Sequence, residues 1–521
     1  MEASWLVSAF TWLAFLVIVI SNIIHYRRPK RNLPPGPKPW PIIGNLNLLI
    51  GSIPHESLHL LSQKYGELMQ LKFGSYPVLV ASSPEMAKQF LKTHDTVFAS
   101  RPALAAGRYT SYNFSDVTWA PYGSYWRQAR KIYLTEIFSS KRLDSYEYIR
   151  IEERHNFLSR LYALSEVRVN GCGKPIVLRG QLSRFSLSSI TRMVLSNKYF
   201  SESKSDDQGS IITLDELQGL LDQWFLLNGV INIGDWIPWL SFLDLQGYVK
   251  QMKDLYKKFD RFHEYVLDDH KAKRDANVKD FVPKDMADVL LQISEDPNLE
   301  VKLTRDGVKG LMQDLLAGGT DTSSTTVEWA FHEIIKKPHI IEKATEELDR
   351  VIGRERWVEE NDFPKLPYIE AIIKETMRLH PLATLLAPHF AIEDCNVSAG
   401  YDISKGTTVL INVWSIGRNP KFWDAAEQFL PERFLDKKID MLGQNFALLP
   451  FGSGRRRCPG YNLGLKIVRS TLANLLHGFN WKLPQNIKPQ DVCLEEIYGL
   501  TTHPKVPLEM IIEPRLPIHL Y

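Results

Sequence analysis

The chain has 521 residues, of which 44% are hydrophobic and 24% are charged, and its 63 Lys and Arg residues against 60 Asp and Glu residues give a formal net charge of +3. These proportions are typical of globular proteins and exclude disorder over most of the length. A charge balance near zero argues against a nucleic-acid binder that neutralises many phosphates. Four cysteines in a chain of this length exclude a disulfide scaffold.

An uncharged, strongly apolar stretch from Ala3 to Ile24 opens the chain. As a helix it is about 33 Å long, enough to cross the hydrocarbon core of a bilayer. Four basic residues follow it and favour the cytosolic side: Arg27, Arg28, Lys30 and Arg31. We therefore expect a membrane anchor over residues 1–26. A cleaved signal peptide is the alternative, but the apolar run is too long for one and its basic flank lies on the wrong side.

The next segment, residues 27–37, is basic and then proline-rich, and Leu33 to Pro37 cannot form a helix. It predicts a stiff hinge between the anchor and the rest of the chain. Residues 38–521 predict one catalytic domain, mainly α with a small β-rich part. Its clearest elements are helices from Arg305 to Lys337, Tyr368 to His380 and Tyr461 to His477, and strands within Leu68 to Ala81 and Val409 to Val413.

One cysteine, Cys458, stands in an unusual setting. Arg455, Arg456 and Arg457 precede it and a predicted helix begins at Tyr461, and both features favour a thiolate. A thiolate here has three possible roles: nucleophile, redox sensor or metal ligand. No histidine base lies nearby in the sequence, and no further Cys or His stands at zinc-ligand spacing. One thiolate is sufficient as an axial haem ligand, because the porphyrin supplies the other four donors.

This segment resembles the haem-binding signature of the cytochromes P450, in which Phe, Gly, Arg, Cys and Gly stand at fixed spacing. The five positions are filled by Phe451, Gly454, Arg456, Cys458 and Gly460. The resemblance implies the cytochrome P450 fold, preceded here by one N-terminal transmembrane helix. It also implies haem b as the cofactor, with these five residues at the cofactor and the sulfur of Cys458 bound to iron.

The middle of the long predicted helix contains Gly318, Gly319, Asp321, Thr322 and Ser323. Glycines and hydroxyl side chains make this the weakest part of the helix by propensity, and such hydroxyls can bend a helix. The segment resembles the oxygen-activating helix of the same family. By that resemblance the glycines leave space for O2 and substrate, Thr322 holds water and hydrogen-bonds bound oxygen, and Asp321 links the site to solvent protons.

A third match is the segment that contains Trp126 and Arg130, which are four residues apart and can share one helix face. The resemblance implies that these two side chains bind the haem propionates, assisted by Arg456 and His389. Without the resemblance, a Trp and an Arg at this spacing are more often core and surface.

A fourth match is Glu375 with Arg378, three residues apart on a predicted helix. Taken alone, this is an exposed ion pair worth a few tenths of a kcal/mol. The family resemblance implies instead a buried pair that Arg433 completes.

Four segments rich in apolar and aromatic residues predict the substrate cavity. The residues expected to line it are Tyr112, Phe114, Leu221, Phe225, Gly318, Leu385 and Leu500.

The resemblance covers essentially the whole chain and implies an NADPH- and O2-dependent monooxygenase that oxidises a small lipophilic plant metabolite. A terpenoid is favoured; a phenylpropanoid or flavonoid, a steroid and a fatty acid are the alternatives. Electrons are expected from a separate flavoprotein, NADPH–cytochrome reductase, because no Gly-rich dinucleotide fingerprint opens a βαβ unit here. Arg127 and Lys131 are candidates for its docking surface. The expected location is the endoplasmic reticulum membrane, with a single pass, lipid contact and a cytosolic catalytic domain.

Two other functions fit the cysteine signature. One is a haem-thiolate isomerase or dehydratase that does not use O2, and the other is a non-catalytic membrane haem-binding protein. Thr322 argues against the first, because such relatives of the family lack a threonine in this helix, and the second would not need the pair of Asp321 and Thr322 above the iron.

Overall fold

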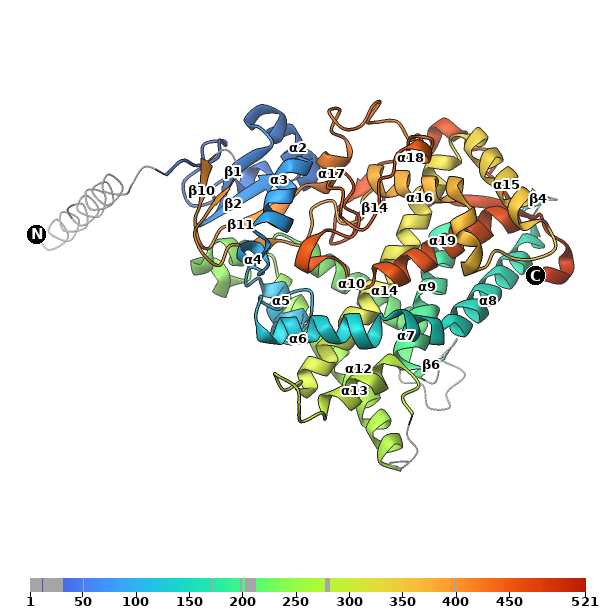
Figure 1. Ribbon diagram of the computed structural model, residues 1–521, viewed down its shortest axis with the longest axis horizontal. Coiled ribbons are helices and arrows are strands. Elements are labelled where there is room, and N and C mark those ends of the chain that lie inside the picture. Colours follow the sequence, from blue (N-terminus) through green and yellow to red (C-terminus); the bar gives the residue numbers. More distant parts are fainter. Residues whose placement is uncertain are drawn as a thin grey trace, which may run out of the picture.

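The computed structural model describes residues 12, 31–49, 51–169, 172–196, 199–201, 212–276, 282–397 and 400–521. Helices make up most of this part of the chain, and the largest sheet lies toward one end of the molecule (Figure 1). The expectation of a mainly α protein with a small β-rich part is confirmed.

The longer helices run through the whole chain. They are α2 (Pro54–Tyr65), α6 (Ser124–Ile132), α8 (Glu147–Ser165), α9 (Leu178–Leu195), α10 (Leu214–Gly229), α12 (Tyr248–Ala276), α13 (Met286–Ser294), α14 (Arg305–Ile334), α15 (Pro338–Ile352), α16 (Pro367–Leu379) and α19 (Tyr461–Gly478). Short helices connect them: α3 (Pro84–Lys88), α4 (Asp95–Phe98), α5 (Ala105–Thr110), α7 (Ser140–Ser145), α11 (Ile233–Trp236), α17 (Val413–Gly417) and α18 (Arg433–Asp436). Single turns of other helix types include η2 (Gln89–Thr93), η3 (Tyr133–Ile137), η5 (Pro238–Leu243), η6 (Glu360–Lys365) and η8 (Gly454–Arg456).

The largest sheet has the strand order β1-β2-β11-β8, with β1 (Leu68–Phe73), β2 (Tyr76–Ala81), β11 (Thr408–Ile411) and β8 (His389–Phe390). The predicted hairpin around Gly74 is confirmed: Phe73 pairs with Tyr76, and Gly74 has a φ of +52°, which suits a glycine in a two-residue turn. A second sheet joins β12 (Phe479–Lys482), β15 (Glu509–Pro514) and β5 (Ile176–Val177). The remaining strands pair two by two: β9 (Cys395–Val397) with β10 (Tyr401–Ile403), β13 (Glu496–Ile497) with β14 (His503–Pro504), β3 (Arg168–Val169) with β4 (Cys172–Gly173), and β6 (Phe200–Ser201) with β7 (Ile212–Thr213).

Helix α14 forms the centre of the core, and α9, α16 and α19 pack against it (Figure 1). It begins where the sequence predicts, since Thr304 accepts a hydrogen bond from the backbone N–H of Gly307. It ends at Ile334 rather than Lys337, because a turn precedes Pro338, which opens α15. A helix buried on nearly all sides can present chemistry to more than one cavity.

The predicted anchor over residues 1–26 lies outside the described residues, apart from Trp12. Among the described residues, no helix combines the length and the apolar character needed to span a bilayer. Of the hinge at residues 27–37, the described part is tied to the body: Arg31 pairs with Asp394 at 3.0 Å, and the backbone N–H of Asn32 donates to Asp402 at 2.8 Å.

Candidate active site

The loop that carries Cys458 is fixed by its own backbone. The N–H of Cys458 donates to the carbonyl of Phe451 over 2.9 Å, and Gly460 is the N-cap residue of α19. Gly454 has a φ of +67°, and a Cβ there would stand 2.0 Å from the carbonyl oxygen of Leu91. Glycine is therefore required at 454, which explains one fixed position of the motif.

The Cys458 sulfur faces an internal cavity, and burial raises the pKa of its thiol. The backbone N–H of Gly460 and the charges of Arg130 and Arg457 oppose that rise without cancelling it. We expected the neighbouring arginines to favour the thiolate. In the protein without a bound metal ion, burial has the larger effect and favours the thiol. Arg455 is directed elsewhere, pairing with Asp95 at 3.0 Å. A bound metal ion deprotonates a coordinating thiol, so the thiolate state belongs to the metal-loaded form.

Two adjoining cavities of about 280 Å³ each meet at Cys458. Both are also lined by Gly318 and Thr322 of α14 and by Phe451 and Arg456, so they are two halves of one slot between α14 and the cysteine loop. The expected cluster of Cys458, Phe451, Gly318 and Thr322 is therefore brought together.

Three guanidinium groups line this slot: those of Arg101, Arg130 and Arg456. Burial lowers the pKa of Arg101 and of Arg130 to about 10, and burial together with the charge of Arg101 lowers the pKa of Arg456 to about 8. Among the described residues, none of the three forms an ion pair with a carboxylate; Arg456, for example, donates to the carbonyls of Ala99 and Val117. Buried cations without an anion are costly, so the slot is suited to a ligand with carboxylates at one edge.

These features fit haem. The slot offers a thiol, three unpaired cations for two propionates, and open space beside Gly318, where an added Cβ would meet nothing within 4 Å. Arg101 was not expected from the sequence; the only sign there is an arginine between short apolar runs, which is a weak one.

The other expected propionate ligands are near the slot, and their donors are already engaged. The indole N–H of Trp126 donates to the carbonyl of Val117 over 3.0 Å. Nδ1 of His389 lies 2.9 Å from the carbonyl oxygen of Phe98 and must carry the proton. Burial lowers the pKa of His389 to about 3, so its ring is neutral and Nε2 is an acceptor. Contacts of Trp126 and His389 with propionates stay predictions.

On α14, the hydroxyl of Thr322 lines the slot and donates to the carbonyl of Gly318 over 2.9 Å. Asp321, which is buried, turns the other way: its Oδ2 accepts from the hydroxyl of Thr501 at 2.7 Å and lies 3.1 Å from Nε2 of His503. Gly319 packs against Ile190, where a Cβ would be 2.4 Å from the Ile190 side chain. Only Gly318 therefore provides the open space that was expected of both glycines.

The expected substrate residues separate into three groups. Gly318 lines the slot, while Phe225 and Leu500 line a different cavity of about 520 Å³ that also contains Asp321. The others are not among the residues that line these cavities: the hydroxyl of Tyr112 is 3.0 Å from Nδ1 of His263, and Phe114 lies against Gly107. Leu221 is buried in the main core, and Leu385 packs beside the large sheet. The slot instead contains Leu382, Ala383 and Leu386, which belong to the segment expected to line it.

The expected buried ion pair on α16 is confirmed. Nε of Arg378 lies 2.7 Å from Oε2 of Glu375, Nε of Arg433 lies 3.0 Å from Oε1, and the side chains of Glu375 and Arg378 are 0% exposed. This network joins α16 to α18.

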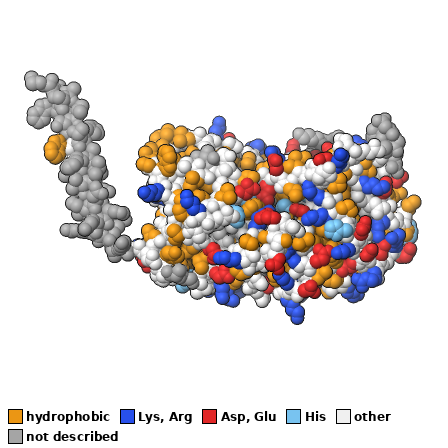
Figure 2. Space-filling model, turned by 90° about the horizontal axis from the view of Figure 1, so that it is seen from above, with side chains coloured by type: hydrophobic (Ala, Val, Ile, Leu, Met, Phe, Trp, Pro, Cys, Tyr) orange, Lys and Arg blue, Asp and Glu red, His pale blue; other side chains and the backbone are white. Residues whose placement is uncertain are grey.

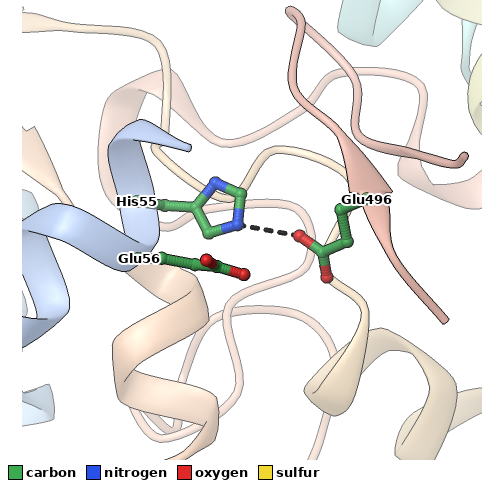
Figure 3. A group of neighbouring side chains, drawn as sticks. All are labelled: His55, Glu56 and Glu496. Carbon is green, nitrogen blue, oxygen red and sulfur yellow. Dashed lines mark hydrogen bonds and ion pairs between the residues drawn. The ribbon is translucent and has the colours of Figure 1, made fainter. Parts of the chain in front are cut away.

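Away from the slot, two groups of described side chains have the composition of a metal site: His55 with Glu56 and Glu496, and His270 with Asp285 and Asp288. In the first, drawn in Figure 3, Nε2 of His55 and Oε2 of Glu496 are 2.8 Å apart, while Glu56 is exposed. In the second, Nδ1 of His270 is 2.7 Å from Asp288. In each group, a hydrogen bond thus joins the imidazole to one of its two acidic neighbours.

A cysteine thiol under a slot rimmed by unpaired buried cations, with a glycine and a threonine above it, defines a haem-thiolate protein. The comparisons with known proteins agree. A sequence model described as cytochrome P450 matches residues 34–508, and the chain belongs to the cytochrome P450 family. It is a haem-thiolate monooxygenase of that family.

The similar proteins include several plant enzymes. The chain is 45% identical to trimethyltridecatetraene synthase from Zea mays, over 95% of this chain and 91% of that one. It is 42% identical to dimethylnonatriene synthase from Zea mays, over 100% and 99%, and 40% identical to flavonoid 3'-monooxygenase from Petunia hybrida, over 98% and 97%. Among solved structures, a zebrafish cytochrome P450 with progesterone aligns with a TM-score of 0.74 and 26% identity, over 89% of this chain and 100% of that one.

Proposed function

We propose that this protein is an NADPH-dependent monooxygenase that oxidises an acyclic terpenoid, receives electrons from a separate NADPH–cytochrome reductase, and works at the endoplasmic reticulum membrane. The observation that carries the proposal is the slot in which the Cys458 thiol faces Thr322 and Gly318. Haem bound there supplies the activation of O2.

The choice of substrate is supported by the relatives and by the cavity. Two of the similar proteins are named as synthases of methyl-branched acyclic polyenes, and methyl branching of an unsaturated chain is also the pattern of acyclic terpenoids, although flavonoid enzymes are nearly as similar. The slot is bounded by apolar side chains, including Leu315, Leu382 and Leu386. Apolar walls hold a lipophilic chain and exclude water from the reacting bond.

The residues that line the slot have different roles in binding the cofactor and in the reaction. Cys458 holds the iron, and Arg101, Arg130 and Arg456 orient the cofactor through its carboxylates. Thr322 lies where its hydroxyl can exchange the bond to Gly318 for one to water or bound oxygen.

The surface of the molecule supports the proposed electron donor and the proposed membrane location. Arg127 and Lys131 are exposed on α6, the helix whose Trp126 and Arg130 line the slot, and they suit an acidic partner, although Arg127 also lies 3.9 Å from Glu300. An apolar end surface consists of Trp40, Ile42, Trp239, Phe242, Leu243 and Leu245, each 49–81% exposed. Its two parts both adjoin the β1–β2 turn, since Gly74 donates to Ile43 and Ser75 to Trp236. Figure 2 shows hydrophobic side chains gathered at one end of the molecule. Such a surface suits contact with lipid.

The test is a panel of farnesol, geraniol, naringenin and progesterone given to membranes that contain the full chain and a plant NADPH–cytochrome reductase. We expect a farnesol or geraniol product that contains one atom from labelled O2, depends on NADPH, and disappears with Cys458→Ser. Product from naringenin or progesterone alone would overturn the substrate class. Product formed without NADPH and O2 would favour the isomerase alternative.

A further inference from the structure

Short contacts join His503 of β14 to Asp321 and Thr325 of α14. Its Nε2 lies 3.1 Å from Oδ2 of Asp321 and 3.0 Å from the hydroxyl oxygen of Thr501, and its Nδ1 lies 3.1 Å from the hydroxyl oxygen of Thr325. Thr325 also reaches Oδ1 of Asp321 at 3.3 Å. One imidazole, one carboxylate and two hydroxyls thus form a closed cluster.

When His503 carries a second proton, every N–H and O–H donor of this cluster has an acceptor within the cluster. The Nε2–H then donates to Asp321 and the Nδ1–H donates to Thr325, which frees the Thr325 hydroxyl to donate to Oδ1 of Asp321. The Thr501 hydroxyl donates to Oδ2. A neutral ring with its proton on Nε2 leaves Nδ1 and Asp321 competing for the single Thr325 proton, and one with its proton on Nδ1 sets the lone pair of Nε2 against the carboxylate of Asp321. The cluster is therefore arranged to hold an imidazolium beside a carboxylate.

The charged groups that face His503 come from three helices. Asp321 and Glu328 of α14 are negative, Asp222 of α10 is an exposed carboxyl, and Arg179 of α9 is positive and bonded to Glu328. Burial lowers the pKa of His503, but the hydrogen bond and charge of Asp321 outweigh it and the pKa lies above its ordinary value, against the opposing charge of Arg179.

Thr501 connects two cavities. It lines the half of the slot that holds Cys458, Thr322 and Leu386, and it also lines the second cavity of about 520 Å³. His503 and Asp321 line only the second cavity. Since Asp321 shares no hydrogen bond with Thr322 among the described residues, the hydrogen-bonded route from Asp321 toward Cys458 passes through Thr501.

We propose that His503 is a positioning residue that loads Asp321 with protons from the second cavity, and that the Thr501 hydroxyl delivers them to the slot. This rests on the monooxygenase reaction, which consumes two protons for each O2. In each transfer the Nε2–H bond of the imidazolium breaks and an O–H bond forms at Oδ2 of Asp321. Asp321 then protonates Thr501, which releases its own proton into the slot. Neutral His503 regains a proton from water in the second cavity, and no electrons move.

The activity test compares wild type with His503→Gln and Thr501→Val, with His339→Gln as a matched control, since His339 is an exposed histidine at the start of α15. The measured quantity is product per NADPH consumed, across pH, with the panel compound that gives most product. We expect wild type to lose yield as pH rises through the pKa of His503. The product formed per NADPH by His503→Gln and by Thr501→Val should be roughly tenfold or more below that of wild type, and it should show no such decrease as pH rises. A decrease retained in His503→Gln would overturn the relay.

A second assay, with hydrogen peroxide in place of NADPH and O2, distinguishes the proton relay from a structural role of His503. Peroxide brings oxygen that is already reduced and protonated, so both variants should form product from it as wild type does. An equal loss with peroxide would make His503 merely structural and would overturn the proposal.

A titration that needs no turnover completes the test. NMR of ring-labelled histidine, with the His503 signal assigned by its loss in His503→Gln, should show a pKa above the ordinary value in wild type and a lower one in Asp321→Asn. A His503 pKa unaffected by Asp321→Asn would overturn the proposal, even if the wild type formed no product from any panel compound. Absence of NADPH-dependent product with a normal titration would instead count against the proposed function alone.

Discussion

Two adjacent glycines of α14 have different roles at the scale of single residues. A Cβ on Gly318 would meet nothing within 4 Å and would point into the slot, whereas a Cβ on Gly319 would collide with Ile190 of α9. The first glycine therefore provides space for ligands, and the second allows two helices to approach.

This difference gives a matched pair of substitutions. Gly318→Ala should leave stability unchanged or raise it by about 1 kcal/mol, because alanine favours helix, while it alters substrate binding. Gly319→Ala should cost about 1–3 kcal/mol, because Ile190 is fully buried and must shift. Chemical denaturation measures both. Equal stability changes in the two variants would contradict the assignment.

At the scale of elements, the ion pairs of the described residues range from fully buried to largely exposed. Glu375 on α16 holds Arg378 and Arg433 without access to water. Asp254 and Lys257 on α12 have the same three-residue spacing and are 54% and 71% exposed. Removing one partner of a buried pair leaves a charge that water cannot reach, whereas water solvates the charge that remains when an exposed pair is broken.

We therefore expect Glu375→Gln to lower the free energy of unfolding by about 3–5 kcal/mol. The control Asp254→Asn should change it by less than about 0.5 kcal/mol. Thermal or denaturant unfolding of the two variants checks this, and a small effect of Glu375→Gln would mean that α16 and α18 are held together by other contacts.

The elements that the sequence predicts well are those whose signals are local. Thr304 before α14, Pro381 after α16 and the glycines around Cys458 mark boundaries that the structure reproduces within a few residues. Residues that reach the site from distant segments carry no such signal. Arg101, Thr501 and His503 meet α14 only through the tertiary fold.

The direction of some side chains also could not be predicted. Tyr112, Asn113 and Phe114 have φ values of +48°, +54° and +64°, a run of left-handed residues that sequence periodicity does not indicate. This turn directs Tyr112 to His263 instead of the slot.

At the scale of the whole molecule, buried histidines tie stability to pH. Burial, and the charge of Lys309, lower the pKa of His263 to about 3 from an ordinary value of 6.5. The unfolded chain therefore binds more protons than the folded one below pH 6.5, and stability is lost as pH falls.

His263→Gln removes this contribution. Wild type should lose up to about 1.4 kcal/mol more per pH unit below the ordinary histidine pKa than the variant does. Denaturant unfolding from neutral to mildly acidic pH measures the two slopes. Parallel slopes would show that His263 is not the group that titrates.

The apolar end surface predicts membrane contact by the body itself. A chain that begins at Arg31 should still float with phosphatidylcholine vesicles, and replacing Phe242 and Leu245 by Ser should reduce the bound fraction severalfold, because most of both side chains is exposed. The matched control replaces Ile518, which is 72% exposed near the C-terminus. Equal flotation of all three chains would contradict a specific lipid-facing end.

Helix α14 carries Gly318 toward one cavity and Asp321, only three positions further along the chain, toward another. Since each residue turns an α-helix by about 100°, inserting or deleting one amino acid upstream would swing both groups away from their cavities together. A change of length in this stretch would therefore disturb both cavities at once, whereas a side-chain substitution changes one position only. Protein engineering that reshapes the ligand space must keep the number of residues between Thr304 and Asp321 unchanged.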